Sequence, residues 1–140
     1  MKLIGFNFSK ISVEKMSNDF SNLNINTNVN IQKIEEVKTD LLKTKETFIG
    51  VKFSFLIDYS PEIAKLELTG TILVGVDPKQ AKEVLKQWAD KKIPEEFNLS
   101  VFNIILRKSN LRAMQLEEEM NLPLHIQLPE VRKELGKEEK

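Results

Sequence analysis

Few residues in this sequence could do chemistry. The chain has one histidine, His125, and no cysteine, so it has neither a thiolate nucleophile nor the combination of Cys and His ligands that binds zinc. A lone histidine between Leu124 and Ile126 is a poor metal site, and we expect it to have a structural role. The five glycines are scattered, without the spacing of a phosphate-binding loop. We therefore expect no metal, no bound nucleotide and no other cofactor.

Paired carboxylates are the remaining catalytic option. Asp58, Glu62 and Glu67 fall near one predicted hairpin and could approach one another there. They occupy the polar alternate positions of their strands, where water surrounds a carboxylate and does not tune it for acid–base work. The acidic run that begins at Glu117 is likewise expected to be a solvated helix end. The sequence therefore predicts a protein that is not an enzyme.

Composition limits the class of protein. The chain has 140 residues, of which 41% are hydrophobic and 30% charged, and this is typical of one globular domain. Its 21 basic and 21 acidic residues cancel, which disfavours a nucleic-acid partner. The apolar stretch near the N-terminus is too short for a signal peptide or a membrane span. We expect a cytoplasmic domain over residues 1–131, no membrane insertion, and a charged flexible tail over residues 132–140.

Alternating apolar and polar residues predict four strands, over residues 4–13, 22–32, 48–60 and 64–76. In the first, the apolar face changes side near Ser9 and Lys10, which indicates a β-bulge. The second places asparagines on the face expected to be solvated. The short connections imply an antiparallel sheet, with residues 35–46 as a charged and mobile hairpin tip.

Two helices are predicted after the strands. The first has Asp77 as N-cap, Pro78 in its first turn and an apolar stripe that ends at Trp88. Pro94 then marks a break, and residues 95–120 form a longer helix whose first half is apolar nearly all round. A four-stranded sheet covers only one side of such a helix, so we expect a subunit interface on the other. The residues assigned to this interface are Phe97, Val101, Phe102 and Ile105.

The fold class predicted is therefore α+β, a four-stranded antiparallel sheet followed by two helices. The aromatic stripe of the third strand contains Phe53, Phe55 and Tyr59. Such a stripe is core in most proteins. A surface that receives apolar peptide segments is the alternative.

The order of these elements resembles the SecB family of export chaperones. The best local match runs from Ile93 and Pro94 through Phe102 and Met114 to residues 121–131, NLPLHIQLPEV. Residues 6–14, FNFSKISVE, are similar to the first strand of the family, and residues 66–70, LELTG, to its fourth. The resemblance implies a cytoplasmic, ATP-independent holdase that binds unfolded or precursor polypeptides and assembles as a homotetramer, a dimer of dimers.

The resemblance also implies site residues. By location in the fold, it assigns client binding to strand and loop residues: Leu23, Ile25, Phe53, Phe55, Leu124 and Ile126. Glu14 and Glu67 match acidic positions that contact the SecA motor in the family, whereas Lys10 stands where the family has an acidic residue. Other clients, such as an antitoxin or unfolded chains in general, remain open.

Two further hypotheses come from other classes of protein. One is a small hotdog-like acyl thioesterase with Asp58 or Glu67 as base, although such folds wrap the sheet around one central helix. The other is a non-catalytic interaction subunit whose apolar helix serves only oligomerisation.

Overall fold

The computed structural model describes residues 1–38 and 45–131, which form four strands followed by two helices. The predicted tail at residues 132–140 and half of the predicted hairpin tip, residues 39–44, lie outside the described residues. The strands are β1 (Lys2–Lys15), β2 (Asn24–Val37), β3 (Thr47–Ser60) and β4 (Ala64–Val76), and the helices are α1 (Pro78–Trp88) and α2 (Glu95–Glu119). No helix among the described residues is long and apolar enough to cross a membrane.

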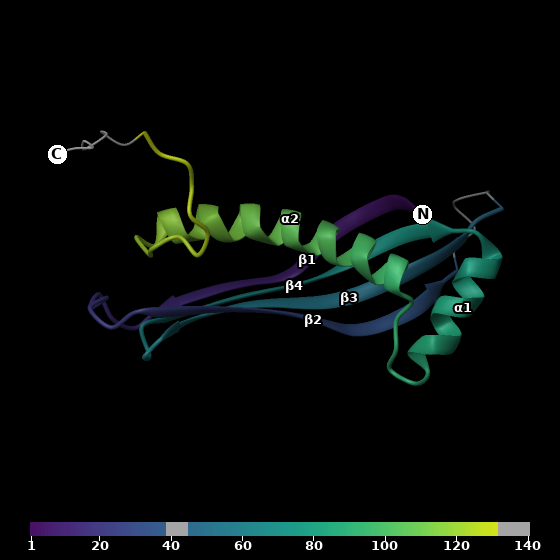
Figure 1. Ribbon diagram of the computed structural model, residues 1–140, viewed down its shortest axis with the longest axis horizontal. Coiled ribbons are helices and arrows are strands. Elements are labelled where there is room, and N and C mark those ends of the chain that lie inside the picture. The colour runs from purple at the N-terminus through teal and green to yellow at the C-terminus, as the bar shows by residue number, and fades with distance from the viewer. Residues whose placement is uncertain (39–44, 132–140) are drawn as a thin grey trace, which may run out of the picture.

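The strands form one antiparallel sheet in the order β1-β4-β3-β2 (Figure 1). The predicted α+β fold, with a four-stranded antiparallel sheet and two helices, is confirmed. The predicted bulge is also confirmed, because the register of β1 against β4 shifts between Phe8 and Lys10. The asparagines of β2 lie on the exposed side, as predicted.

The prediction that residues 35–46 form a hairpin tip is wrong at its first end, because β2 continues to Val37, and agrees at its second end, because β3 begins at Thr47. A second bulge explains the error. The register of β2 against β3 shifts between Ile31 and Lys33, and this shift turns both Ile31 and Ile34 toward the core. The simple alternation therefore ends at the bulge although the strand does not.

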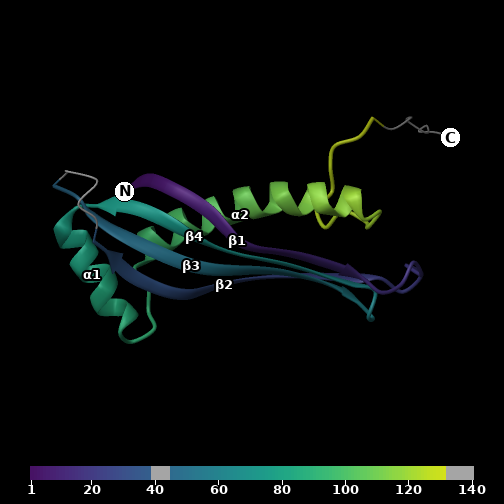
Figure 2. The same ribbon diagram turned by 180° about the vertical axis from the view of Figure 1, so that it is seen from behind.

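The start of α1 follows from local capping chemistry. The Asp77 carboxylate accepts hydrogen bonds from the backbone N–H groups of Lys79 at 2.7 Å and Gln80 at 3.2 Å, and Pro78 follows it in the first turn. α1 lies at one end of the sheet and packs against β2 and β3, while α2 runs along one face of the sheet (Figure 1). In the view from behind, the sheet stands in front of α2 (Figure 2).

The core lies between α2 and the sheet. The helix contributes residues at every fourth position, so the buried line turns slowly around the helix and follows the twisted sheet. These residues are Phe97, Val101, Ile105, Ser109, Ala113 and Glu117. Phe53, Phe55 and Tyr59 of β3 have no exposed surface, so the aromatic stripe is core.

Candidate functional site

The end of α2 turns the chain back along the helix. Asn121 has a φ of 53°, and the backbone N–H groups of Asn121 and Leu122 donate to the carbonyls of Glu118 and Glu117 at 3.3 and 2.8 Å. This pair of bonds is a Schellman motif, with asparagine in the left-handed position. Lys15 Nζ of β1 also donates to the carbonyl of Asn121 at 3.2 Å. The chain after α2 therefore leaves in a fixed direction.

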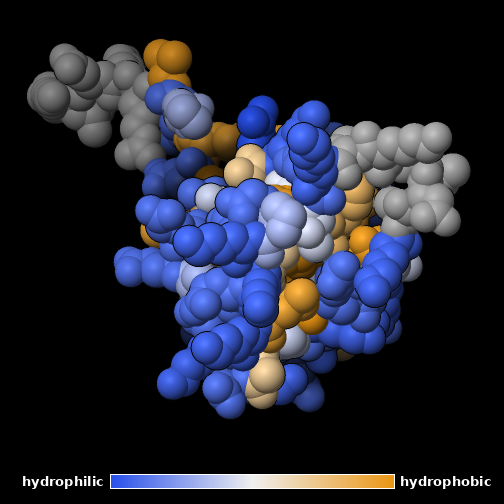
Figure 3. All heavy atoms as spheres, turned by 90° about the vertical axis from the view of Figure 1, so that its right-hand side faces the viewer, coloured by the Kyte–Doolittle hydropathy of each residue, from blue (hydrophilic) through white to orange (hydrophobic). Residues whose placement is uncertain are grey.

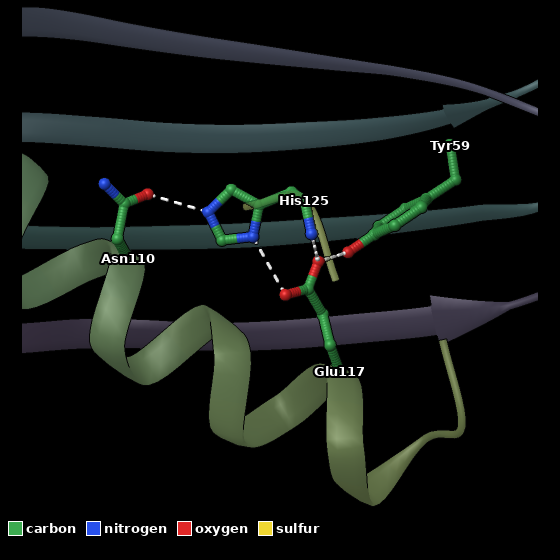
Figure 4. Close-up of polar contacts among 4 residues, drawn as sticks. All are labelled: Tyr59, Asn110, Glu117 and His125. Carbon is green, nitrogen blue, oxygen red and sulfur yellow. Dashed lines mark hydrogen bonds and ion pairs between the residues drawn. The ribbon is translucent and has the colours of Figure 1, made fainter. Parts of the chain in front are cut away.

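This turn places His125 beside α2, where four residues form a buried polar cluster: Tyr59, Asn110, Glu117 and His125 (Figure 4). The backbone N–H of His125 donates to Glu117 Oε2 at 3.0 Å, and the Tyr59 hydroxyl donates to the same oxygen. His125 Nδ1 lies 2.8 Å from Glu117 Oε1, and Nε2 lies 2.7 Å from Asn110 Oδ1. Asn110 and Glu117 are two helical turns apart, so both face the same ring.

Three of the four side chains of the polar cluster, those of Tyr59, Glu117 and His125, are buried, while Asn110 is half-buried at its edge. The side chain of Glu117 is 0% exposed and that of His125 is 2% exposed. Burial, together with the hydrogen bond to Glu117 and its negative charge, raises the pKa of Tyr59 above its ordinary value of 10.0. A substrate has no access to these groups, so the arrangement fits the structural role expected of His125. Within the described ranges, His, Asp and Glu side chains form no group of three that could hold a metal ion.

The expectation that the acidic run from Glu117 is a solvated helix end is wrong for Glu117. Glu117 comes four residues after the buried Ala113, on the line of α2 that faces the sheet. Glu118 and Glu119 are exposed as expected. Sequence reasoning missed the polar cluster, although one signal was present: Asn110 and Glu117 lie seven residues apart and therefore share a face of the helix.

The chain after α2, residues 122–131, turns back along the helix and is called the returning segment. It forms one wall of an apolar groove of about 400 Å³ on the outer side of α2. Leu111, Met114, Gln115 and Glu118 contribute from the helix, and Leu124 and Leu128 from the returning segment. Leu111 and Leu128 are 52% and 51% exposed and line the same groove, so their apolar surfaces form one patch. These six residues form an exposed apolar surface, here named the client groove.

A larger hollow of about 510 Å³ lies between the first turns of α1 and α2. Most of the residues around it are charged, among them Lys79, Glu83, Glu95 and Glu96. Figure 3 faces the end of the molecule where α1 lies and shows a hydrophobic area surrounded by hydrophilic side chains. Because charged residues surround this hollow, the client groove is better suited to a wholly apolar segment.

The predicted client-binding residues lie in two different environments. Phe53 and Phe55 are 0% exposed in the core, so they offer no surface to a client in this conformation, and their assignment to client binding stays a prediction. Leu124 lines the client groove, and Ile126 is half-buried in the same segment. Leu23 and Ile25, around the start of β2, are half-buried and pack against the core.

Most of the predicted interface residues lie in the core of their own chain, and their role in an interface stays a prediction. Phe97, Val101 and Ile105 are buried against the sheet of their own chain, and Phe102 is partly buried beside them. Because the helix is apolar nearly all round, its sequence did not reveal which face meets the sheet. The apolar side chains that α2 exposes most are Leu99, at 56%, and Leu111.

Of the acidic residues considered for a motor or for catalysis, Glu62 lies in the turn between β3 and β4, and the others lie on the polar face of the sheet. Glu14 is opposite Lys65 in the register of β1 and β4, two positions from Glu67. Lys10 Nζ forms an ion pair with Glu67 Oε1 at 3.0 Å. Asp58 of β3 is exposed and opposite Lys65 of β4. The structure therefore brings the carboxylates on the sheet near basic partners.

The fold is similar to that of one solved protein described here. Among solved structures, the chain is similar to the Mycobacterium tuberculosis Rv1957 SecB-like chaperone, which was solved in complex with a ChAD peptide from the Rv1956 HigA1 antitoxin. The fold is similar to that of a SecB-like chaperone. The likeness has a TM-score of 0.53 and covers 94% of this chain and 91% of the other, at 6% sequence identity. Neither a protein-family model nor a curated protein matches the sequence, so the likeness concerns the fold.

Proposed function

We propose that this chain is an ATP-independent chaperone of the cytoplasm that holds non-native polypeptides and catalyses no reaction. The observation that carries the proposal is the client groove, an exposed apolar surface in a chain with the fold of a SecB-like chaperone. Apolar segments of unfolded chains would enter this groove because burying apolar surface stabilises a complex by about 25 cal/mol per Å². Contacts of this kind are non-directional, so they accept many client sequences.

The clients we propose are unfolded or precursor chains, including antitoxins. The peptide bound by the structural neighbour comes from an antitoxin, and this supports a polypeptide partner here. An export motor of the SecA type has weaker support. Lys10 neutralises Glu67 on the face where the motor would meet acidic residues.

We also propose that the chain assembles as a homotetramer. Leu99 on the outer side of α2 is more exposed than is usual for leucine, and a second copy would cover it. Such an assembly would place several client grooves on one particle, and weak contacts to one long client would then add up.

Light scattering of an aggregation-prone protein during refolding tests the chaperone function. We expect the wild-type chain to suppress aggregation without ATP, and Leu111→Ser to suppress it much less because the change removes apolar surface from the groove. The matched control is Met16→Ser, since Met16 is also 52% exposed but lies outside the groove.

Wild-type protein that is folded but fails to suppress aggregation would contradict the proposal. Turnover of an acyl-CoA, lost on Asp58→Asn or Glu67→Gln, would favour the thioesterase hypothesis in its place. A well-formed oligomer that binds no client would favour the interaction subunit.

A further inference from the structure

The segment after α2 has two sides with different chemistry. Leu124 and Leu128 form a wall of the client groove. The side chain of His125, which lies between them in the sequence, is 2% exposed and belongs to the polar cluster. Residues 122–131 belong to no helix or strand, so no backbone ladder holds this wall in place. Side-chain contacts must therefore set its position.

Asn110 and Glu117 of α2 both contact His125 of this segment. Glu117 accepts one hydrogen bond from the backbone of His125 and one from its ring, and Asn110 contacts the other ring nitrogen. The ring also packs against Phe55 of β3, with the ring centroids 6.0 Å apart. All three kinds of contact fall on one residue of the segment.

We propose that Asn110, Glu117 and His125 form a latch that sets the width of the client groove, so that they are positioning residues for client binding although none of them lines the groove. This inference rests on the function proposed above. A carboxylate buried at 0% exposure needs its donors, because its charge is expensive to desolvate. His125→Ala removes the ring contacts to Asn110 and Glu117 and keeps the backbone N–H bond of residue 125 to Glu117, so the hold of α2 on the segment weakens and the segment moves away from the helix.

Tyr59 provides a control within the same cluster. Its hydroxyl donates to Glu117, but it belongs to β3 and makes no bond to the returning segment. Tyr59→Phe therefore destabilises the cluster and leaves the latch closed. His125→Ala and the milder Asn110→Ala both open the latch, so either variant tests it if the other folds poorly.

Two measurements on the full chain test whether the latch sets the position of the returning segment. The chain has no cysteine, so Arg107→Cys and Gln127→Cys introduce a unique pair of spin labels on α2 and on the segment, outside the groove-lining residues. The interspin distance distribution is expected to be narrow in the wild-type background and in Tyr59→Phe. It is expected to be broad and longer in His125→Ala and Asn110→Ala.

Affinity is measured for one probe, reduced and carboxymethylated α-lactalbumin, by fluorescence anisotropy. We expect His125→Ala to weaken binding by about tenfold, which corresponds to about 1.4 kcal/mol, and Tyr59→Phe to leave it unchanged. An unchanged distance distribution in both latch variants, or equal affinity loss in Tyr59→Phe and His125→Ala, would overturn the latch. If wild type does not bind the probe, the proposed chaperone function fails, and the distance distributions alone decide whether the latch holds the segment.

Discussion

Glu117 is a carboxylate without exposed surface, and its oxygens are surrounded by donors from β3 and from the returning segment. A buried anion is tolerated when hydrogen bonds replace its hydration, and hydrogen bonds to charged groups are roughly twice as strong as neutral ones. The Tyr59 hydroxyl is one of these donors, so its proton is held by the folded structure. Loss of that proton would place a second negative charge beside Glu117.

This arrangement predicts an unusual alkaline titration of Tyr59. Its pKa is raised above 10.0 in the folded chain, so the stability that it contributes is complete below that pH and is lost as the pH rises toward the folded pKa. Above pH 10.0, the free energy of unfolding should fall by about 1.4 kcal/mol per pH unit from this group. Tyr59 is the one tyrosine of the chain, so tyrosinate absorbance reports it alone.

We expect tyrosinate to appear together with the loss of far-ultraviolet circular dichroism. In Glu117→Gln, which lacks the neighbouring negative charge, it should appear at lower pH. A chain that stays folded while tyrosinate forms near pH 10.0 would refute this account of Tyr59.

The buried role of Glu117 illustrates a general limit of the sequence. Three consecutive glutamates near a helix end indicate a solvated run, and two of them are solvated. The remaining one, Glu117, is buried because the line of α2 that faces the sheet turns with the twist of the strands. That line depends on how the helix lies on the sheet, which is a long-range property.

The strands and helices themselves were predictable because their signals are local. Alternation located the four strands, the change of apolar face located the bulge after Phe8, and Asp77 with Pro78 located the start of α1. The face of α2 that meets the sheet was not predictable, since Phe97, Leu99 and Phe102 offer apolar surface in several directions. Only the packed structure selects one of them.

The contact between β1 and β4 beside the bulge gives a prediction about these elements. A Cβ at Gly70 would lie 2.9 Å from the ring of Phe53 and would clash with the carbonyl oxygen of Asn7. Neither neighbour can move easily, because Phe53 is 0% exposed and Asn7 belongs to the paired β1 backbone. We expect Gly70→Ala to lower the free energy of unfolding by about 1–3 kcal/mol, measured by urea denaturation.

Gly5→Ala is the matched control. A Cβ at Gly5 would meet no atom within 4 Å, and Gly5 lies on the same pair of strands. We expect its midpoint to stay close to that of wild type. Equal denaturation midpoints for Gly70→Ala and wild type would show that β1 and β4 do not approach as closely as described.

For the molecule as a whole, one helix on one face of a four-stranded sheet leaves apolar surface uncovered. Among the exposed large apolar residues, several lie on β1, on α2 and on the returning segment: Leu3, Ile11, Leu99, Leu111 and Leu128. The sequence predicted this surplus, because a helix that is apolar nearly all round needs cover on more than one side. It did not reveal which residues carry the surplus.

Sedimentation equilibrium of Leu99→Glu tests whether a second copy covers this surface. Leu99 is 56% exposed and lies outside the client groove, so a glutamate there is harmless in a monomer. In the proposed homotetramer it would place a charge in a subunit contact, where desolvation is costly. We expect wild type to sediment as a tetramer and Leu99→Glu as a smaller species. The control is Met16→Glu, which adds the same charge at a similarly exposed residue and should keep the wild-type mass. A monomeric wild type would contradict the assembly, and an unchanged mass for Leu99→Glu would move the contact to the remaining exposed residues of β1.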